Sequence, residues 1–183
     1  MSKEKQVKSG VRQQRNVKNT VDWISVDEIN TYLRKNRNVV FDFSAGKSFC
    51  SCRTNQFDNH LSGVSDFIEK FKELIDVIGK LSQHRVSELF DNNNNFRHCH
   101  SIVDKDCVAR NVIDALYSDD DYVKQFCEGE KLYQAGYDKG VRLVGILKTN
   151  VFYVVFVDYF HDLYPDDKKN IRSKKTHNYS ISI

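Results

Sequence analysis

Residues 140–165 read GVRLVGILKTNVFYVVFVDYFHDLYP and contain two mostly apolar runs, Val141–Leu147 and Val151–Val157. Only the polar residues 148–150 separate them. Runs of β-branched and aromatic residues joined by so short a break are typical of a two-stranded antiparallel hairpin. The second run is apolar on both faces of the pleat, which predicts a central strand covered on both sides.

The polar residues that follow the second run are the first candidates for a functional site. Asp158, His161, Asp162 and Tyr164 come directly after it and precede Pro165, the only proline of the chain. Loops at strand ends are enriched in binding and catalytic residues. The same residues would also serve to end a strand, so their spacing leaves a site and a structural terminus open.

The rest of the chain alternates helices with short strands. Ser25 and Glu28 form a capping box that opens a short helix, and apolar residues at helical spacing mark a long helix over 64–81. Further expected elements are strands at 39–43, 96–103 and 132–137, helices at 86–90, 108–117 and around 122–126, and a loop at 92–95. This order predicts an α+β fold in which an antiparallel sheet with a C-terminal β-meander packs on helices.

Length and composition fit one globular domain with extensions. The chain has 183 residues, of which 40% are hydrophobic, and this is ample for a core. We expect a disordered basic arm at 1–20, one α+β domain at 21–165 and a flexible basic tail at 166–183. Because no stretch is apolar enough for a membrane helix or a secretion leader, and the cysteines number five, we expect a cytoplasmic protein with reduced thiols.

Charge is unevenly distributed along the chain. Residues 1–19 carry six cations and one acid, and residues 166–183 carry five cations and two acids. The whole chain has a net charge of +3, so the body between the two ends has a net charge of −5. Basic ends can be solvated extensions or arms that bind phosphate. The candidate RNA-binding residues are Lys168, Lys169, Arg172, Lys174, Lys175 and Arg97.

The C-terminal pattern resembles a known superfamily. The segment RLVG at 142–145, the apolar run 151–157 and the segment DYFHDLY at 158–164 are similar to the ending of small bacterial toxins of the RelE/ParE superfamily. The same ending, preceded by FRHCH at 96–100, also resembles uncharacterised proteins of phages and plasmids. The resemblance implies a RelE/ParE-like fold and a mobile-element protein that acts on a host process.

For the nuclease branch, the resemblance implies metal-independent RNA cleavage without a cofactor. His161 would be the general acid or base, and Tyr164 would orient or exchange a proton. Arg142 would steady the charge on the scissile phosphate, and Asp158 would orient these groups. Arg97 or His98 would join from a neighbouring strand. In a purely structural role, Arg142 would instead pair with Asp158 across the hairpin while Tyr164 closes the sheet edge.

Other interpretations involve protein partners rather than RNA. The resemblance implies a cognate antitoxin or a host protein as partner, and the ParE branch acts on a protein target without cutting anything. Alternatively, the chain is a non-enzymatic interaction protein that inhibits a host or defence enzyme through an acidic surface around Asp119–Asp121. The sequence leaves the oligomeric state open.

Pairs of cysteines and histidines raise the question of zinc. Residues two apart in extended chain project to the same side, so Cys50 with Cys52, and His98 with His100, could each offer two ligands to one ion. The alternative is isolated thiols packed in the core as small hydrophobes, and we expect no metal. Walker, dinucleotide, Gly-x-Ser-x-Gly and His-Glu-x-x-His motifs do not occur, which argues against those enzyme classes.

Overall fold

The computed structural model describes residues 24–91, 94–103, 108–138, 140–164 and 177–182. In chain order the elements are α1 (Val26–Asn36), β1 (Val40–Asp42), α2 (Val64–Leu81), α3 (Val86–Phe90), a 3₁₀ turn (Asn94–Phe96), β2 (His100–Ser101), α4 (Val108–Leu116), α5 (Asp121–Cys127), β3 (Leu132–Ala135), β4 (Arg142–Lys148) and β5 (Val151–Asp158). The protein therefore has the mixed α+β composition that the sequence predicts. No helix in these described ranges is long and apolar enough to cross a membrane.

The strands form one mixed sheet in the order β1-β5-β4-β3-β2. The pairs β5-β4, β4-β3 and β3-β2 are antiparallel, which confirms the C-terminal meander. However, β1 runs parallel to β5, with Val40 opposite Val151, so the prediction of a purely antiparallel sheet is wrong. The reason is physical: the apolar pattern of a strand records which faces are buried, but it does not record the direction of a distant partner strand.

The hairpin β4–β5 occupies the middle of the sheet. Lys148 pairs with Val151, so Thr149 and Asn150 make the turn, and Thr149 adopts a φ of 56°. The register shifts at a β-bulge between Val144 and Gly145. At this bulge a Cβ atom on Gly145 would lie 1.9 Å from the carbonyl oxygen of Tyr153. The close approach of the two backbones therefore requires glycine at position 145.

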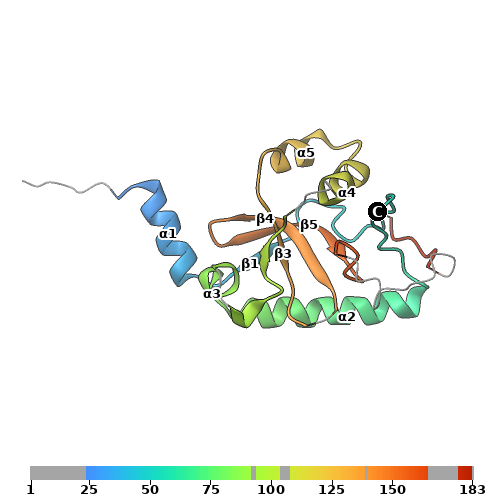
Figure 1. Ribbon diagram of the computed structural model, residues 1–183, viewed down its shortest axis with the longest axis horizontal. Coiled ribbons are helices and arrows are strands. Elements are labelled where there is room, and N and C mark those ends of the chain that lie inside the picture. Colours follow the sequence, from blue (N-terminus) through green and yellow to red (C-terminus); the bar gives the residue numbers. More distant parts are fainter. Residues whose placement is uncertain (1–23, 92–93, 104–107, 139, 165–176, 183) are drawn as a thin grey trace, which may run out of the picture.

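Helices cover both faces of the sheet (Figure 1). On one face α2 and α3 enclose a core that includes Leu74, Leu89, Leu143 and Phe152. On the other face α4 and α5 enclose a second core that includes Val112, Val123, Val144 and Phe156. Because residues of β4 and β5 alternate between the two cores, β5 is buried on both sides, which confirms the prediction for residues 151–157.

The expected strand at 96–103 is much shorter than its apolar pattern indicates. Only His100 and Ser101 form a strand, β2, which pairs with β3 at the edge of the sheet. Before it, the amide of Cys99 donates to the carbonyl of Phe96 at 2.8 Å and closes a turn. Arg97 and His98 therefore lie in a turn that leads into the edge strand, and this turn brings both side chains to the end of the sheet.

The described part of the C-terminus lies against residues 51–61. Leu61 and Tyr179 exchange backbone hydrogen bonds of 3.1 and 2.8 Å. The amide of Ser51 donates to the carbonyl of Ile181 at 2.8 Å, and the amide of Ile181 donates to the Ser51 hydroxyl at 2.9 Å. Residues 177–182, for which the sequence predicts a flexible tail, thus form part of the folded body.

Candidate functional site

The polar cluster at the ends of β3, β4 and β5 is built around Arg142. This arginine is the first residue of β4, and it faces Asp158, the last residue of β5. Gly136 follows β3 directly, and a Cβ atom there would lie 2.5 Å from Cδ of Arg142. The missing side chain at Gly136 therefore makes the space in which Arg142 lies, with only 1% of its surface exposed.

Neutral acceptors hold the buried guanidinium of Arg142. Its Nη1 donates to the carbonyls of Gly140 and Val141 at 2.9 and 3.1 Å, and its Nη2 lies 3.2 Å from Nδ1 of His98. Its Nε has no hydrogen-bond partner among the described residues. Burial lowers the pKa of Arg142, while the charge of Asp158 acts in the opposite direction. A buried cation without a bound carboxylate costs stability, and such positions are frequently functional.

Asp158 is fully buried, and its carboxylate organises the loop that follows β5. Its Oδ1 accepts hydrogen bonds from the amides of Phe160 and Asp162 at 3.1 and 2.9 Å, and its Oδ2 accepts one from the amide of Leu163 at 2.9 Å. The carboxylate is thus committed to backbone donors. It stands opposite Arg142 in the sheet, as the structural interpretation requires, but it makes no ion pair with that residue in the described contacts.

The loop organised by Asp158 brings His161 and Tyr164 to the cluster. His161 has a φ of 63°, the left-handed region that few residues with a side chain adopt. The ring of Tyr164 lies 6.3 Å from that of His161 and 6.1 Å from that of His100. Tyr164 also packs against the core under α4 and α5.

Both His98 and His161 favour the neutral form. Burial, followed by the charge of Arg142, lowers the pKa of His98 to about 4. The same two causes, in the same order, lower the pKa of His161. A neutral imidazole at pH 7 can accept a proton, which is what a general base requires. His161 therefore has the protonation state that its proposed role needs.

These shifts predict that the protein loses stability in mild acid. From about pH 6.5 downward an unfolded histidine takes up a proton, whereas His98 in the folded protein stays neutral until about pH 4. The unfolded state therefore binds more protons in this window, and the free energy of unfolding falls as the pH falls. We expect His98 to account for about 1–2 kcal/mol, because partial exposure reduces the effect.

Urea unfolding of the wild-type protein and the His98→Gln variant from pH 7 to pH 4 measures this contribution. As the pH falls from 7 to 4, the unfolding free energy of the wild-type protein should decrease more than that of the variant. A difference that does not depend on pH would show that His98 titrates normally. The His84→Gln variant, which changes a histidine outside the cluster, serves as the control.

A basic groove lined with aromatic rings runs along the edge strand β2 and the start of β3. It has a volume of about 680 Å³, and its lining includes Arg34, Arg97, Lys131, Phe90, Phe96 and Tyr133. Nζ of Lys131 lies 5.6 Å from the centre of the Tyr133 ring. Among the described residues of the lining, Asp91 is the only carboxylate, and it pairs with Arg34 at 3.1 Å. His100 also lines the groove, which connects it to the Arg142 cluster.

The structure brings together five of the predicted site residues. Arg142, Asp158, His161 and Tyr164 share the cluster, and Arg97 joins it because its Nε lies 3.2 Å from Nε2 of His98. The expected RNA-binding residues of the tail, Lys168, Lys169, Arg172, Lys174 and Lys175, lie outside the described residues.

Sequence reasoning missed Gln134, Arg34 and Lys131. Gln134 is 1% exposed within β3, its Nε2 lies 3.5 Å from Nε2 of His100, and its Oε1 has no partner among the described residues. A glutamine in an otherwise apolar strand is a signal that could have drawn attention to it. No comparable signal exists for Arg34 and Lys131, because they are distant in the sequence and the fold alone brings them to the groove.

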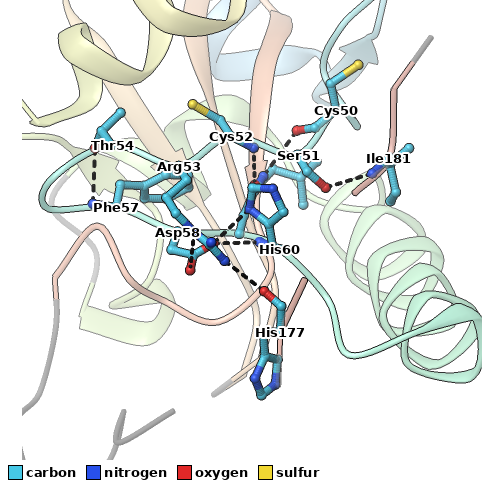
Figure 2. A network of polar contacts seen from close by, with 12 residues as sticks. Cys50, Ser51, Cys52, Arg53, Thr54, Phe57, Asp58, His60, His177 and Ile181 are labelled. Carbon is cyan, nitrogen blue, oxygen red and sulfur yellow. Dashed lines mark hydrogen bonds and ion pairs between the residues drawn. The ribbon is translucent and has the colours of Figure 1, made fainter. Parts of the chain in front are cut away.

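The pairs proposed for zinc lie apart. Cys50 and Cys52 belong to the core under α4 and α5, and Figure 2 shows their side chains leaving the chain in different directions. Within the described ranges, no three His, Cys, Asp or Glu side chains are grouped to hold a metal ion. Burial raises the pKa of Cys52 and of Cys99 to about 11, so both thiols stay protonated at neutral pH.

A second polar network joins the 51–61 segment to the C-terminus (Figure 2). Asp58 has a side chain that is 1% exposed, and it accepts hydrogen bonds from Nε of Arg53 at 3.0 Å and from the ring of His60 at 2.9 Å. Nη2 of Arg53 donates to the carbonyl of His177 at 2.8 Å. Because its contacts connect segments of the chain, we interpret this network as structural.

The acidic segment at 119–121 is largely engaged in local contacts. Asp119 forms an ion pair with Lys47, and Asp121 forms one with Lys124 at 2.8 Å. The side chain of Asp120 caps α5 by accepting a hydrogen bond from the amide of Val123 at 3.1 Å.

The fold and the cluster define an α+β protein with a buried arginine and half-buried histidines at one end of a mixed sheet. A family model described as Uncharacterised protein UU032 matches residues 45–182. This match covers more than half of the chain, so the protein belongs to that family. The matched range contains β2 to β5 and therefore the whole Arg142 cluster. The searches of curated proteins and of solved structures found no match.

Proposed function

We propose that the protein binds single-stranded RNA in the groove along β2, and that it is a toxin-like protein of a phage or plasmid acting on a host process in the cytoplasm. The observation that carries the RNA proposal is the lining of the groove. Within the part of the chain that the structure describes, it combines three cations with three aromatic rings and one carboxylate, which is paired with Arg34. Cations attract the phosphate backbone, and rings stack on unpaired bases.

Exposure supports the assignment of roles within the groove. Arg97 is exposed, so it can contact phosphate directly, whereas Phe96 and Tyr133 are half-buried and offer their rings to a base. Lys131 lies over the ring of Tyr133 and would place a charge beside a stacked base. The basic tail expected at 166–183 would add further phosphate contacts.

RNA cleavage is a second candidate function, and the neutral state of His161 favours it. His161 would take the proton from the attacking hydroxyl, with Tyr164 at 6.3 Å between ring centres to orient it. Arg142 is too deeply buried to touch a polymer phosphate in this conformation, so it would act by holding His98. Such a mechanism uses no metal ion and resembles that of the RelE branch.

The alternative is inhibition of a host or defence enzyme through the acidic surface. Its main acids make local contacts, with Asp119 and Asp121 paired to lysines. Pairing lowers the net charge that this surface would offer to a basic partner, so the geometry supports RNA better. A cognate antitoxin or a host protein is the partner that the resemblance to toxins implies.

Binding of a short labelled single-stranded RNA to the full chain tests the proposal. We expect the Arg97→Gln/Lys131→Gln variant to bind about tenfold or more weakly, and its dependence on salt to be shallower by about 0.7 per lost contact. The matched control is Arg37→Gln/Lys72→Gln, which removes two exposed cations outside the groove. Equal losses of RNA affinity in both variants would reject the groove as the binding site and would indicate only nonspecific electrostatic attraction.

The same samples report on cleavage. Intact RNA after long incubation with the wild-type protein would argue against a nuclease. Fragments that persist with the His161→Ala variant would reject His161 as the base. Reversal of charge at Asp119 and Asp121 should leave RNA affinity unchanged or raise it.

A further inference from the structure

The contacts of His98 contain a conflict between hydrogen-bond donors. Nη2 of Arg142 lies 3.2 Å from Nδ1 of His98, and Nε of Arg97 lies 3.2 Å from Nε2 of the same ring. An arginine only donates hydrogen bonds, and a neutral imidazole has one donor and one acceptor. His98 can therefore accept a hydrogen bond from only one of the two arginines. Protonating the ring would make both contacts donor against donor.

The hydrogen bond from the buried Arg142 to His98 is the one that the protein needs more. Arg142 is 1% exposed, and its Nε is already without a partner. An additional unpaired donor in the interior would cost much more than one at the surface. Nδ1 of His98 therefore accepts from Arg142, which leaves the ring proton on Nε2. As a result, the N–H groups at Nε2 of His98 and at Nε of Arg97 face each other, and Arg97 lines the groove.

We propose that a phosphate group binds between Arg97 and His98, where its oxygens accept hydrogen bonds from both. This inference rests on the proposed RNA-binding function only for the source of the phosphate. The phosphate site itself is inferred from the contacts of Arg97 and His98. Arg97 is exposed and lines the groove, so its guanidinium can turn toward a ligand without unfolding. The low pKa of His98 agrees with a neutral ring that donates through Nε2.

Phosphate fits these donors better than a single carboxylate does. The guanidinium of Arg97 offers donors in a planar fork, and the imidazole adds one from a different direction. A tetrahedral oxyanion presents oxygens in both directions at once. Arg142 adds a positive charge behind the ring, and Asp91, the one carboxylate among the described residues of the lining, is paired with Arg34.

Arg97 and His98 differ in role from the buried Arg142. Arg97 and His98 would be binding residues, whereas Arg142 is a positioning residue that fixes the tautomer of His98 from behind. Its replacement should therefore change the tautomer as well as the affinity. Side-chain NMR reports the tautomer of His98 directly, and a residue with a merely structural role would not alter it.

Titration of the full chain with inorganic phosphate, followed by the side-chain NMR signals of Arg97 and His98, tests the inference. We expect a saturable shift of the Nε–H of Arg97 and the Nε2–H of His98. The Arg97→Gln and His98→Gln variants should each bind phosphate about tenfold or more weakly. Arg37→Gln, which removes an exposed arginine outside the groove, should bind like the wild-type protein. The site would be overturned if the wild-type protein showed no saturable shift, including the case in which only the control variant showed one.

RNA oligonucleotides that carry a terminal phosphate or only terminal hydroxyls distinguish the sources. Tighter binding of the phosphorylated RNA, lost in Arg97→Gln, would assign the site to an RNA end, and equal binding lost in that variant would assign it to an internal phosphate. A protein that binds free phosphate but does not bind RNA would support this site and reject the proposed function. RNA binding that needs Lys131 but not Arg97 or His98 would support the function and overturn this site.

Discussion

Replacing Asp158 with alanine should lower the free energy of unfolding by about 3–5 kcal/mol. The side chain is fully buried and accepts three backbone hydrogen bonds from the loop that carries His161 and Tyr164. Alanine would leave those donors without their acceptor in a poorly solvated place. It would also remove the negative charge that raises the pKa of Arg142, so a buried cation would lose its compensation. Urea unfolding at neutral pH measures the loss.

Two further variants make the Asp158 experiment decisive. Asp158→Asn keeps the shape and one acceptor oxygen, so its stability should fall between those of the wild-type and alanine proteins. Glu69→Ala removes an exposed acid from α2 and should change stability by less than about 0.5 kcal/mol. A loss below about 1 kcal/mol for Asp158→Ala would mean that the loop amides find other acceptors, and that Asp158 does not organise the site.

The sequence predicts the local elements well because their signals are local. The Ser25–Glu28 capping box, the helix over 64–81 and the 86–90 helix occur as expected. Their hydrogen bonds join residues a few positions apart, so composition and spacing determine them. The strand expected at 96–103 was overestimated, because a turn at Phe96–Cys99 satisfies the backbone instead. The parallel pairing of β1 with β5 depends on the whole fold and leaves no mark in either segment.

The candidate site shows the same division between local and global information. Asp158, His161 and Tyr164 could be selected from one segment, since a single loop holds them together. The burial of Arg142 could not be anticipated, because an arginine at the start of a strand is usually solvated. It becomes buried here through Gly136, which directly follows β3, and through His98 in a distant turn.

Replacing Gly136 with alanine should displace Arg142 and lower the free energy of unfolding by about 2–4 kcal/mol. The new methyl carbon would lie 2.5 Å from Cδ and 2.9 Å from Nε of that residue, well inside contact distance. Arg142 cannot yield easily, because its carbonyl partners and His98 fix the guanidinium. The pKa of His98 should rise toward its ordinary value as the positive charge moves away, and an NMR titration of the ring measures that rise.

Gly140→Ala is the matched control, because it adds the same methyl group nearby, but next to a side chain that can move away. Its methyl carbon would lie 2.8 Å from Oε2 of Glu73, a half-exposed carboxylate that can rotate away. We expect a loss below about 1 kcal/mol and no change in the pKa of His98. The Gly136→Ala/Arg142→Ala pair completes a double-mutant cycle, in which removal of Arg142 should cancel most of the cost of the methyl group. Additive losses in that cycle would show that Gly136 serves the backbone rather than Arg142, and the proposed origin of the buried arginine would fail.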